Sequence, residues 1–562
     1  MVVISPLRGT PDANPDTQIS FLGVPAGELG AIVVTGSRSG RHSGRLEAYS
    51  TGTGASFLPR KPFVAGERVT VSATVAAGAT AEAIGTAFHV AKPYQLSPPN
   101  SNNRVAVTAS NVMHFYSEPK LRPNAVAVTT PAADPSAGDI FIAPDSGAGL
   151  DGPMIVSPTG SLVWFDQLRR GMTAYNFQVQ QYGGQPVLTW WEGSVVDGHG
   201  QGVDVIENDN YAPLATVRAG NGLYADLHDF VITAQDTAWL TAYAPIHWNL
   251  SLFGGPSDGL LDDSTVQEID IKTGLVMFQW NALGHVELSD TYEAIPPLTP
   301  TPFDFFHVNS VDPQADGDVL ISSRNTSTAY LISDTTGAIL WRLGGKKSTF
   351  ELGPDVRFAW QHDVEMLPNG TITVFDNEDG APARPTPSRA IDIAINAQAR
   401  TATLVYALTY PGNRVLASTQ GDVQLLANDD EFVGWGSAGV VSEFSPTGQL
   451  TFAMRFYWPT HTYRAFRAPW SGQPLARPAL VAAGKPTPGS TRLYVSWNGA
   501  TDVASWQVLA GASLTSLATI GSYPSTGFET AILAPTVGPY VCVHAISASG
   551  AVLNTACRVL RA

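Results

Sequence analysis

Short stretches in which apolar and polar residues alternate run through most of the chain. Residues 319–324 and 371–375 are typical, because each follows a tight turn and is rich in β-branched or aromatic side chains. The spacing of an amphipathic helix, with an apolar residue at every third or fourth position, is nearly absent. The pattern therefore predicts an all-β protein.

A turn that ends in glycine precedes a short apolar strand at four places, which are marked by Gly160, Gly274, Gly337 and Gly448. The intervals between these glycines are 114, 63 and 111 residues. Weaker forms of the turn, at residues 209–213 and 396–400, divide the two long intervals roughly in half. Six strand-rich units of this length are typical of a β-propeller. We therefore predict a six-bladed propeller over residues 119–477, with seven blades as the alternative.

Both ends of the chain contain strands without this repeat. In residues 1–118, turns separate short strands at the spacing of a sandwich, so we expect an N-terminal immunoglobulin-like β-sandwich. In residues 478–562, two predicted strands, 492–497 and 504–509, each contain a tryptophan. Here we expect a C-terminal sandwich of fibronectin type III-like or immunoglobulin-like type.

Charge and hydropathy argue against two kinds of partner. The formal net charge is −16 at pH 7, whereas nucleic-acid binding depends on cationic side chains that neutralise phosphates. No stretch of 18 apolar residues occurs in the chain. We expect neither nucleic-acid binding nor a membrane span.

The two cysteines, Cys542 and Cys557, flank a predicted two-residue turn at Ser549 and Gly550. Such a hairpin places the cysteines directly opposite each other and within disulfide reach. Two buried thiols that never bond are the alternative. Because disulfides are typical of exported proteins, we expect a secreted protein whose signal peptide is absent from this sequence.

Three histidines take equivalent places in the repeat. His307 and His362 lie 55 residues apart, and His228 lies 79 residues before His307, which corresponds to one unit plus an insertion. The first strand of each propeller blade lines the central channel, so we expect the three imidazoles to converge there with Asn309 and Arg324. A single histidine beside an aspartate is more often structural, but three at equivalent positions indicate a functional cluster.

His199 is a candidate fourth member of this cluster. It lies in the glycine-rich segment 197–202, where glycines permit close approach of the backbone. A plain loop is the alternative interpretation. The other histidines follow no such pattern, and we expect them to be structural or at the surface.

The same residues resemble those of the arylsulfotransferases, bacterial enzymes that move sulfate from one phenol to another without a nucleotide donor. The matching stretches lie within residues 135–470, at 225–230, 306–311, 323–324, 361–370 and 375–377. Two later segments, 433–437 and 463–467, resemble a shorter, actinobacterial and fungal branch of the family.

The resemblance implies that His362 becomes sulfated and that His228, His307, Asn309 and Arg324 are the other catalytic residues. His228 would exchange protons with the two phenols. Arg324, Asn309 and a protonated His307 would stabilise the negative charge of the sulfuryl group. His199 and Trp435 are weaker candidates for substrate binding, and neither a cofactor nor a metal is expected.

The leading hypothesis is therefore a secreted aryl sulfate sulfotransferase that works through a sulfohistidine, with a small aromatic sulfate as donor and a phenol as acceptor. A lyase or hydrolase that acts on a polysaccharide with the same His/Arg cluster is a second hypothesis. A metal site held by three or four imidazoles is a third. A propeller that binds without catalysis is a fourth.

Overall fold

A computed structural model of the chain describes residues 2–77, 80–96, 111–134, 138–296, 301–382, 386–412, 415–487, 490–535 and 538–560. Regular structure in these residues consists of β-strands and of 3-10 helices of three residues, namely η1 (Ala26–Glu28), η4 (Ser251–Phe253), η5 (Leu288–Asp290) and η6 (Gly436–Ala438). Among the described residues, no helix is long and apolar enough to cross a membrane. The all-β prediction is confirmed.

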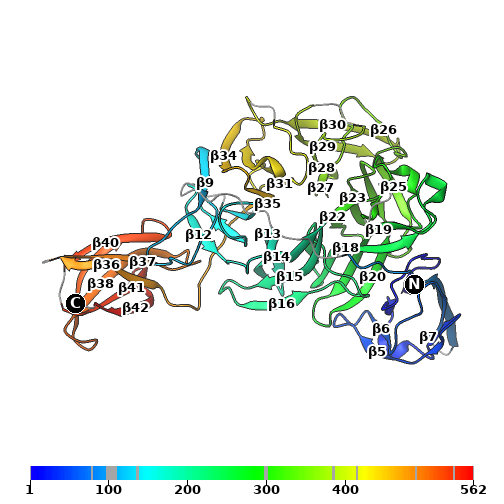
Figure 1. Cartoon of the computed structure of the whole chain (residues 1–562), viewed down its shortest axis with the longest axis horizontal. Helices are drawn as coiled ribbons and strands as arrows, with labels where there is room; N and C mark the ends of the chain where they lie inside the picture. The colour runs from blue at the N-terminus through cyan, green and yellow to red at the C-terminus, as the bar shows by residue number, and fades with distance from the viewer. Residues whose placement is uncertain are drawn as a thin grey trace.

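Six antiparallel sheets form the central part of the molecule (Figure 1). From the axis outwards, the first sheet contains β35 (His461–Ala468), β10 (Asp139–Asp145), β11 (Met154–Val156) and β12 (Leu162–Phe165). The second contains β13 (Thr173–Tyr182), β14 (Gln185–Val196), β15 (His199–Glu207) and β16 (Pro213–Val217). The third contains β17 (Phe230–Ile232), β18 (Thr237–Trp248), β19 (Gly259–Asp270) and β20 (Leu275–Asn281), with β21 (Phe303–Asp304) beside β19.

The other three sheets repeat this order. The fourth contains β22 (Val308–Pro313), β23 (Val319–Ser323), β24 (Thr328–Ile332) and β25 (Ile339–Gly344). The fifth contains β27 (His362–Met366), β28 (Thr371–Asp376), β29 (Arg389–Asn396), β30 (Thr401–Leu408) and β26 (Glu351–Leu352). The sixth contains β31 (Asp422–Leu425), β32 (Glu431–Gly434), β33 (Val440–Phe444), β34 (Leu450–Phe456) and β9 (Val126–Thr130).

The innermost strands of the six sheets form a closed ring. Strand β13 contacts β17, and the contacts continue through β22, β27, β31 and β35 back to β13. Strand β35 comes from the end of this region but pairs with β10 from its start, which joins the last sheet to the first. Six sheets whose inner strands meet around one axis form a six-bladed β-propeller, so the blade count is six.

The glycine turns of the sequence repeat lie at one place in every blade. The four clear turns precede β12, β20, β25 and β34, and the two weaker ones precede β16 and β30, which are the fourth strands of their blades. Gly160, Gly274, Gly337 and Gly448 have φ between 70° and 80°. Glycine adopts this left-handed conformation without strain. Its recurrence before the outer strands therefore marked the turns in the sequence.

The N-terminal unit consists of two sheets that share one apolar core. One contains β1 (Val3–Ser5), β2 (Ile19–Leu22), β6 (Gly54–Pro59) and β5 (Gly44–Ala48), and the other contains β4 (Gly40–His42), β3 (Val33–Gly36), β7 (Arg68–Ala77) and β8 (Thr80–His89). The unit packs on the outer strand of the third blade, where the side chains of Gln18 and Ser20 donate hydrogen bonds to the carbonyl oxygen of Val276.

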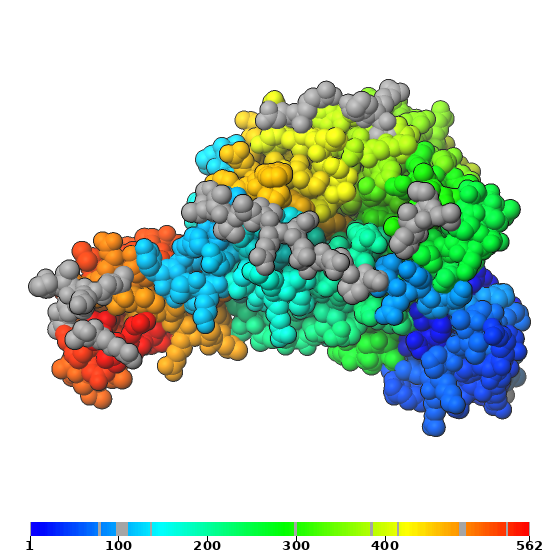
Figure 2. All heavy atoms as spheres, in the orientation of Figure 1, coloured from blue at the N-terminus to red at the C-terminus, as the bar shows by residue number. Residues whose placement is uncertain are grey.

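The C-terminal unit also has two sheets around a core of its own. They contain β36 (Ala479–Thr487), β37 (Ser490–Ser496) and β40 (Glu529–Pro535), and β39 (Leu517–Pro524), β38 (Val503–Gly511), β41 (Tyr540–Ser547) and β42 (Val552–Val559). Figure 2 shows the two terminal units at opposite ends of the propeller. Their immunoglobulin-like and fibronectin type III-like classes stay predictions, as do the domain limits.

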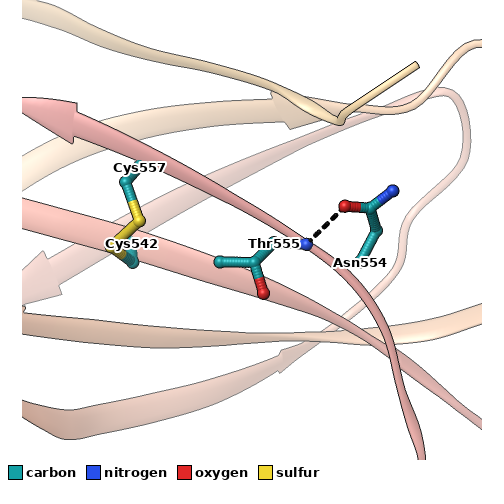
Figure 3. The surroundings of a disulfide bond; sticks show 4 residues. All are labelled: Cys542, Asn554, Thr555 and Cys557. Carbon is teal, nitrogen blue, oxygen red and sulfur yellow. Dashed lines mark hydrogen bonds between the residues drawn. A yellow bond between two sulfur atoms is a disulfide. The ribbon is translucent and has the colours of Figure 1, made fainter.

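The predicted hairpin of the C-terminal unit is confirmed. Strands β41 and β42 pair with Cys542 directly opposite Cys557, and a disulfide joins the two residues (Figure 3). The turn itself differs from the predicted two-residue turn, because Ile546 pairs with Val552 and a register shift between Ala545 and Ile546 restores the pairing of the two cysteines.

Candidate functional site

Four histidines from successive blades gather at one side of the channel and form what we call the histidine cluster. His199 begins β15, His228 lies just before β17, His307 lies just before β22, and His362 begins β27. The ring centroid of His307 lies 4.9 Å from that of His228 and 5.2 Å from that of His199. The ring of Tyr463 lies 5.6 Å from His228 and 6.2 Å from His362. The three predicted histidines and the candidate fourth thus lie in one region.

The glycine-rich segment explains how His199 reaches the others. Asp197 and Gly198 have φ values of 50° and 88°, as in the tight turns that join two strands of a hairpin. The backbone N–H of Gly200 donates a hydrogen bond of 2.5 Å to Oδ1 of Asp226. A Cβ on Gly200 would lie 2.4 Å from the backbone nitrogen of Leu227, so the backbone approach that links the second and third blades requires glycine here.

Two buried carboxylates orient two of the imidazoles. Nδ1–H of His228 donates to Oδ2 of Asp226, and Nδ1–H of His307 donates to Oδ2 of Asp304, each at 2.5 Å. Burial favours the protonated acids, but the interactions with the histidines dominate. They lower the pKa of Asp226 to about 2 and hold the pKa of Asp304 well below its usual value.

Both aspartates are therefore ionised at neutral pH, and each keeps Nδ1 of its imidazole protonated. Within the described residues, Nε2 of His228 and Nε2 of His307 have no hydrogen-bond partner. These two nitrogens are available to a substrate.

His199 has a different electrostatic state. Its Nδ1 lies 3.2 Å from Asp262 and its Nε2 lies 3.1 Å from Asp304. Burial by itself would lower the pKa of His199, but the two carboxylates raise it well above the usual value. His199 is accordingly an imidazolium, which balances buried negative charge and cannot act as a nucleophile.

His362 is held as a neutral ring. Its Nδ1–H donates to Oδ1 of Asn377 at 2.8 Å, and the amide of Asn377 is fixed by the carbonyl oxygens of Ala417 and Gln420. Its Nε2 accepts a hydrogen bond of 3.1 Å from the backbone N–H of Gln420. Burial, together with the positive charge of Arg324, lowers the pKa of His362 well below its usual value. The lone pair of His362 is therefore on Nε2.

Arg324 supplies a positive charge without a counter-ion. Its guanidinium stacks 3.9 Å above the ring of Trp360, and Nη1 donates to Asn325. Its Nε is buried without a hydrogen-bond partner, and in the described parts of the chain the side chain makes no ion pair. Burial, His228 and Arg324 lower the pKa of His307 to about 4 despite Asp304. A buried guanidinium that feels Asp304 only beyond ion-pair distance, beside the neutral rings of His307 and His362, suits an anionic ligand.

Asn309 and Trp435, two predicted site residues, make hydrogen bonds within the protein, although Oδ1 of Asn309 is buried without a partner in the described structure. Asn309 donates from Nδ2 to the carbonyl oxygen of Gln361 at 2.7 Å and is fully buried between two inner strands. Trp435 is fully buried between the fifth and sixth blades, where its Nε1 donates to Ser442 and its ring packs on Phe375. The structure does not bring Trp435 to the histidine cluster, so its predicted role in substrate binding has no support in the geometry.

Sequence reasoning missed the carboxylates and the tyrosines of the site. Asp226 and Asp304 precede their histidines by two and three residues, and this recurrence was a readable signal. Asp262 and Tyr243 left no such signal, because they reach the cluster only through the pairing of β18 with β19. The ring of Tyr243 lies 3.9 Å from that of His199, and its hydroxyl donates to the carbonyl oxygen of Val308.

One part of the cluster has the composition of a metal site. His199, Asp304 and His307 offer ligand atoms that all lie within 4.8 Å of one another. Imidazole nitrogens and a carboxylate suit zinc and other divalent transition metals. A metal there would have to displace the proton that His199 carries between its two aspartates.

Comparison with solved structures gives distant matches. A protein of unknown function from Bacteroides caccae is 12% identical, with 58% of this chain and 97% of that chain covered and a TM-score of 0.37. Virginiamycin B lyase from Staphylococcus aureus is 10% identical, with 69% and 95% covered and a TM-score of 0.28. A periplasmic gluconolactonase from Pseudomonas aeruginosa is 11% identical, with 71% and 99% covered and a TM-score of 0.31. Likeness at this level assigns no activity to the chain.

Comparison of sequences is more specific. No curated protein matches the chain. Residues 178–457, however, match the arylsulfotransferase (ASST) family, and this stretch contains all four histidines of the cluster and Arg324. Residues 178–457 are therefore similar to the arylsulfotransferase family model, which spans 280 of the 562 residues of the chain.

Proposed function

We propose that the propeller transfers a sulfuryl group from an aryl sulfate to a phenol, by way of a sulfated histidine. The observation that carries the proposal is the buried charge of Arg324, which makes no direct ion pair among the described residues and lowers the pKa of both His307 and His362. A sulfate ester is an anion that can fill this position. The family match over residues 178–457 supports the same chemistry.

In the first half-reaction, Nε2 of His362 attacks the sulfur of the donor. A nitrogen–sulfur bond forms, and the bond between sulfur and the aryl oxygen breaks. The aryl oxygen leaves with the electron pair and takes a proton from Nε2 of His228, which enters this step protonated. Attack also requires Nε2 of His362 to give up its hydrogen bond from Gln420, and the freed N–H can then bond a sulfuryl oxygen.

In the second half-reaction, a phenol replaces the first product. Nε2 of His228 takes the phenolic proton while the phenol oxygen attacks sulfur, and the nitrogen–sulfur bond breaks. Asp226 keeps Nδ1 of His228 protonated throughout, so that proton exchange is confined to Nε2. Both histidines return to their starting states, and no cofactor is required.

The test is a transfer assay with p-nitrophenyl sulfate as donor. We expect nitrophenolate release to rise when phenol is added and aryl sulfate to appear on the phenol. Mass spectrometry after exposure to donor alone should show one sulfuryl group on the peptide that contains His362. A sulfuryl group on His228 or His307 would support sulfuryl transfer but identify that histidine as the nucleophile. The proposed function is refuted if addition of phenol does not increase release from any member of a panel of aryl sulfates.

A metal centre is the second candidate, because His199, Asp304 and His307 have suitable ligand spacing. The unpaired charge of Arg324 beside His307 opposes a second cation at this place, so we favour sulfuryl transfer. Elemental analysis of the purified protein separates the two candidates without knowledge of the substrate. One equivalent of zinc, copper or iron that is lost in His307→Asn would favour the metal centre.

We also propose that the protein is exported. The support is the disulfide between Cys542 and Cys557, since such bonds persist mainly in oxidising compartments. Fractionation of producing cells with an antibody against the C-terminal unit tests this proposal.

A further inference from the structure

A cleft of about 480 Å³ lies between the N-terminal unit and the propeller. Its propeller wall includes His199, Tyr243 and Asp262, which belong to or contact the histidine cluster. Its other wall includes Asp12 and Asp16 of the N-terminal unit. The cleft therefore leads from an interface between two folding units to one edge of the candidate active site.

The wall next to the N-terminal unit is held in place by backbone pairing. The backbone N–H of Tyr94 donates to the carbonyl oxygen of Pro245, and the N–H of His247 donates to the carbonyl oxygen of Lys92. The chain that leaves the N-terminal unit thus runs beside β18, the strand that carries Tyr243. The aromatic rings of Tyr94 and of Tyr224, which is 59% exposed, line this part of the cleft.

The chemistry of the lining is acidic. Asp12, Asp16 and Asp262 contribute carboxyl groups, whereas no lysine or arginine is found among the described residues that line the cleft. Asp12 and Asp262 are each 2% exposed, and Oδ1 of each has no hydrogen-bond partner in the described structure. Buried carboxylate oxygens without partners are costly unless a ligand satisfies them.

Arg324 does not line this cleft. The anionic donor is drawn towards Arg324, which lies next to His307 and His362. In the cleft, the positive charge of His199 is offset by Asp262 and Asp304, and Asp12 and Asp16 add further negative charge. The charges therefore divide the site into a part for the sulfate group and a part that attracts a cation.

We propose that the cleft is the acceptor subsite and that it selects phenols that carry a protonated amine over phenols that carry a carboxylate. This inference rests on the proposed sulfuryl transfer and adds the substrate class. The aromatic body of such a phenol packs against tyrosine rings, and its ammonium group donates to carboxylate oxygens that otherwise lack partners.

The test uses three phenols of one skeleton and the full-length protein. Tyramine carries an ammonium group, 4-ethylphenol is uncharged, and 3-(4-hydroxyphenyl)propionate carries a carboxylate. By calorimetry without donor, we expect tyramine to bind at least about 10-fold more tightly than the propionate, with 4-ethylphenol between them. Equal dissociation constants for all three would overturn the proposal.

Asp16→Asn identifies the cleft as the place of binding. Asp16 is exposed at the rim, so the variant should fold, and we expect tyramine to bind about 3-fold more weakly while 4-ethylphenol is unaffected. Asp316→Asn is the matched control, because Asp316 is also an exposed aspartate but does not line the cleft. If Asp316→Asn weakens tyramine as much as Asp16→Asn does, overall charge explains the preference and the proposal fails.

The failure of this inference is distinguishable from failure of the proposed function. If p-nitrophenyl sulfate is turned over with equal kcat/KM for the three acceptors, sulfuryl transfer stands and acceptor selection by charge is refuted. If no transfer occurs but Asp16-dependent binding of tyramine is observed, the cleft binds cationic phenols as proposed and the proposed sulfuryl transfer is wrong.

Discussion

The histidine cluster and the charge network around Arg464 lie side by side on the same inner strands, and they are built in opposite ways. Residues that are adjacent in the sequence belong to different networks. His228 and His362 belong to the cluster, whereas Asp229 and Asp363, the next residues in the sequence, contact Arg464. One short segment in each of two blades thus serves both networks.

In the Arg464 network, the cation is in direct ion pairs with two aspartates, although Nε of Arg464 and Oδ1 of Asp363 have no hydrogen-bond partner in the described structure. The guanidinium of Arg464 lies 3.1 Å from Asp229 and 3.3 Å from Asp363, and it donates to Asn176 and to the carbonyl oxygen of Asn309. The second oxygen of each aspartate accepts a backbone N–H from the next blade. Arg464 therefore ties five inner strands together in a region without solvent.

The histidine cluster leaves charge and hydrogen-bonding capacity unused. Arg324 has no carboxylate partner and Asp304 Oδ1 has no hydrogen bond in the described structure. Removing one member of a buried ion network destabilises a fold strongly because its partners stay buried without a counter-charge, whereas a buried cation that has no ion pair suits a ligand of opposite charge. We therefore expect substitutions in the cluster to affect turnover and substitutions around Arg464 to affect stability.

The largest expected effect is the loss of kcat in His362→Asn, which tests whether the histidine cluster serves turnover. Loss of the nucleophile should lower kcat more than about 1,000-fold, on the order of 4 kcal/mol, with little change in the melting temperature. His544→Asn, in the C-terminal unit, is the control and should keep full activity. A variant His362→Asn that retains more than about a tenth of kcat would show that His362 is not the nucleophile.

The next largest effect is expected on stability, when the cation of the Arg464 network is removed. Arg464→Met leaves Asp229 and Asp363 buried without their partner, so we expect the free energy of unfolding to fall by about 3–5 kcal/mol. The measurement is denaturant unfolding, and Asp363→Ala should also lose more stability than activity. Adding Asp229→Asn and Asp363→Asn to Arg464→Met should restore part of the loss. A wild-type unfolding midpoint in Arg464→Met would contradict the assigned structural role.

Arg324→Met tests the expectation that a cation of the histidine cluster serves turnover and not stability. Loss of the unpaired cation should lower kcat/KM for an aryl sulfate about 100-fold, or roughly 2.7 kcal/mol, while the melting temperature stays the same or rises. Free guanidinium should restore part of the activity. Arg342→Met is the matched control, because Arg342 also lies over an aromatic ring, that of Tyr330, outside the cluster. Equal losses of activity in both variants would argue against a specific role for Arg324.

The smallest effect concerns a pair of carboxyl groups that has no cation at all. Asn281 donates to Asp12 of the N-terminal unit and to Asp263 of the propeller, and burial raises the pKa of Asp12 to about 6. Because the folded pKa lies above the unfolded one, the stabilisation by the protonated acid is complete below about pH 4 and is lost as the pH rises through 6.

Asp12→Asn should remove this pH dependence. Differential scanning calorimetry at pH 4.5 and 7.5 should show a larger gain in melting temperature at pH 7.5, equivalent to about 1–3 kcal/mol. Asp16→Asn, at an exposed neighbouring position, should leave the pH profile unchanged. If Asp12→Asn destabilises the protein equally at both pH values, Asp12 is ionised at the interface.

Much of the architecture was present in the sequence, because its signals are local. Glycines at positive φ before four of the six outer strands, alternating apolar residues and a hairpin between Cys542 and Cys557 depend mainly on neighbouring residues. The equivalence of His228, His307 and His362 followed from the repeat, since a ring of blades brings equivalent positions together.

Only the tertiary structure decided which charges meet and which stay unpaired. Asp304 contacts His199 across 105 residues, and Arg464 contacts Asp229 across 235 residues. Two nearby carboxylates make His199 a cation, whereas burial and Arg324 keep His362 neutral, although both are histidines near glycine or aspartate in the sequence. Protonation and pairing depend on burial and on separation through space, neither of which the order of residues along the chain specifies.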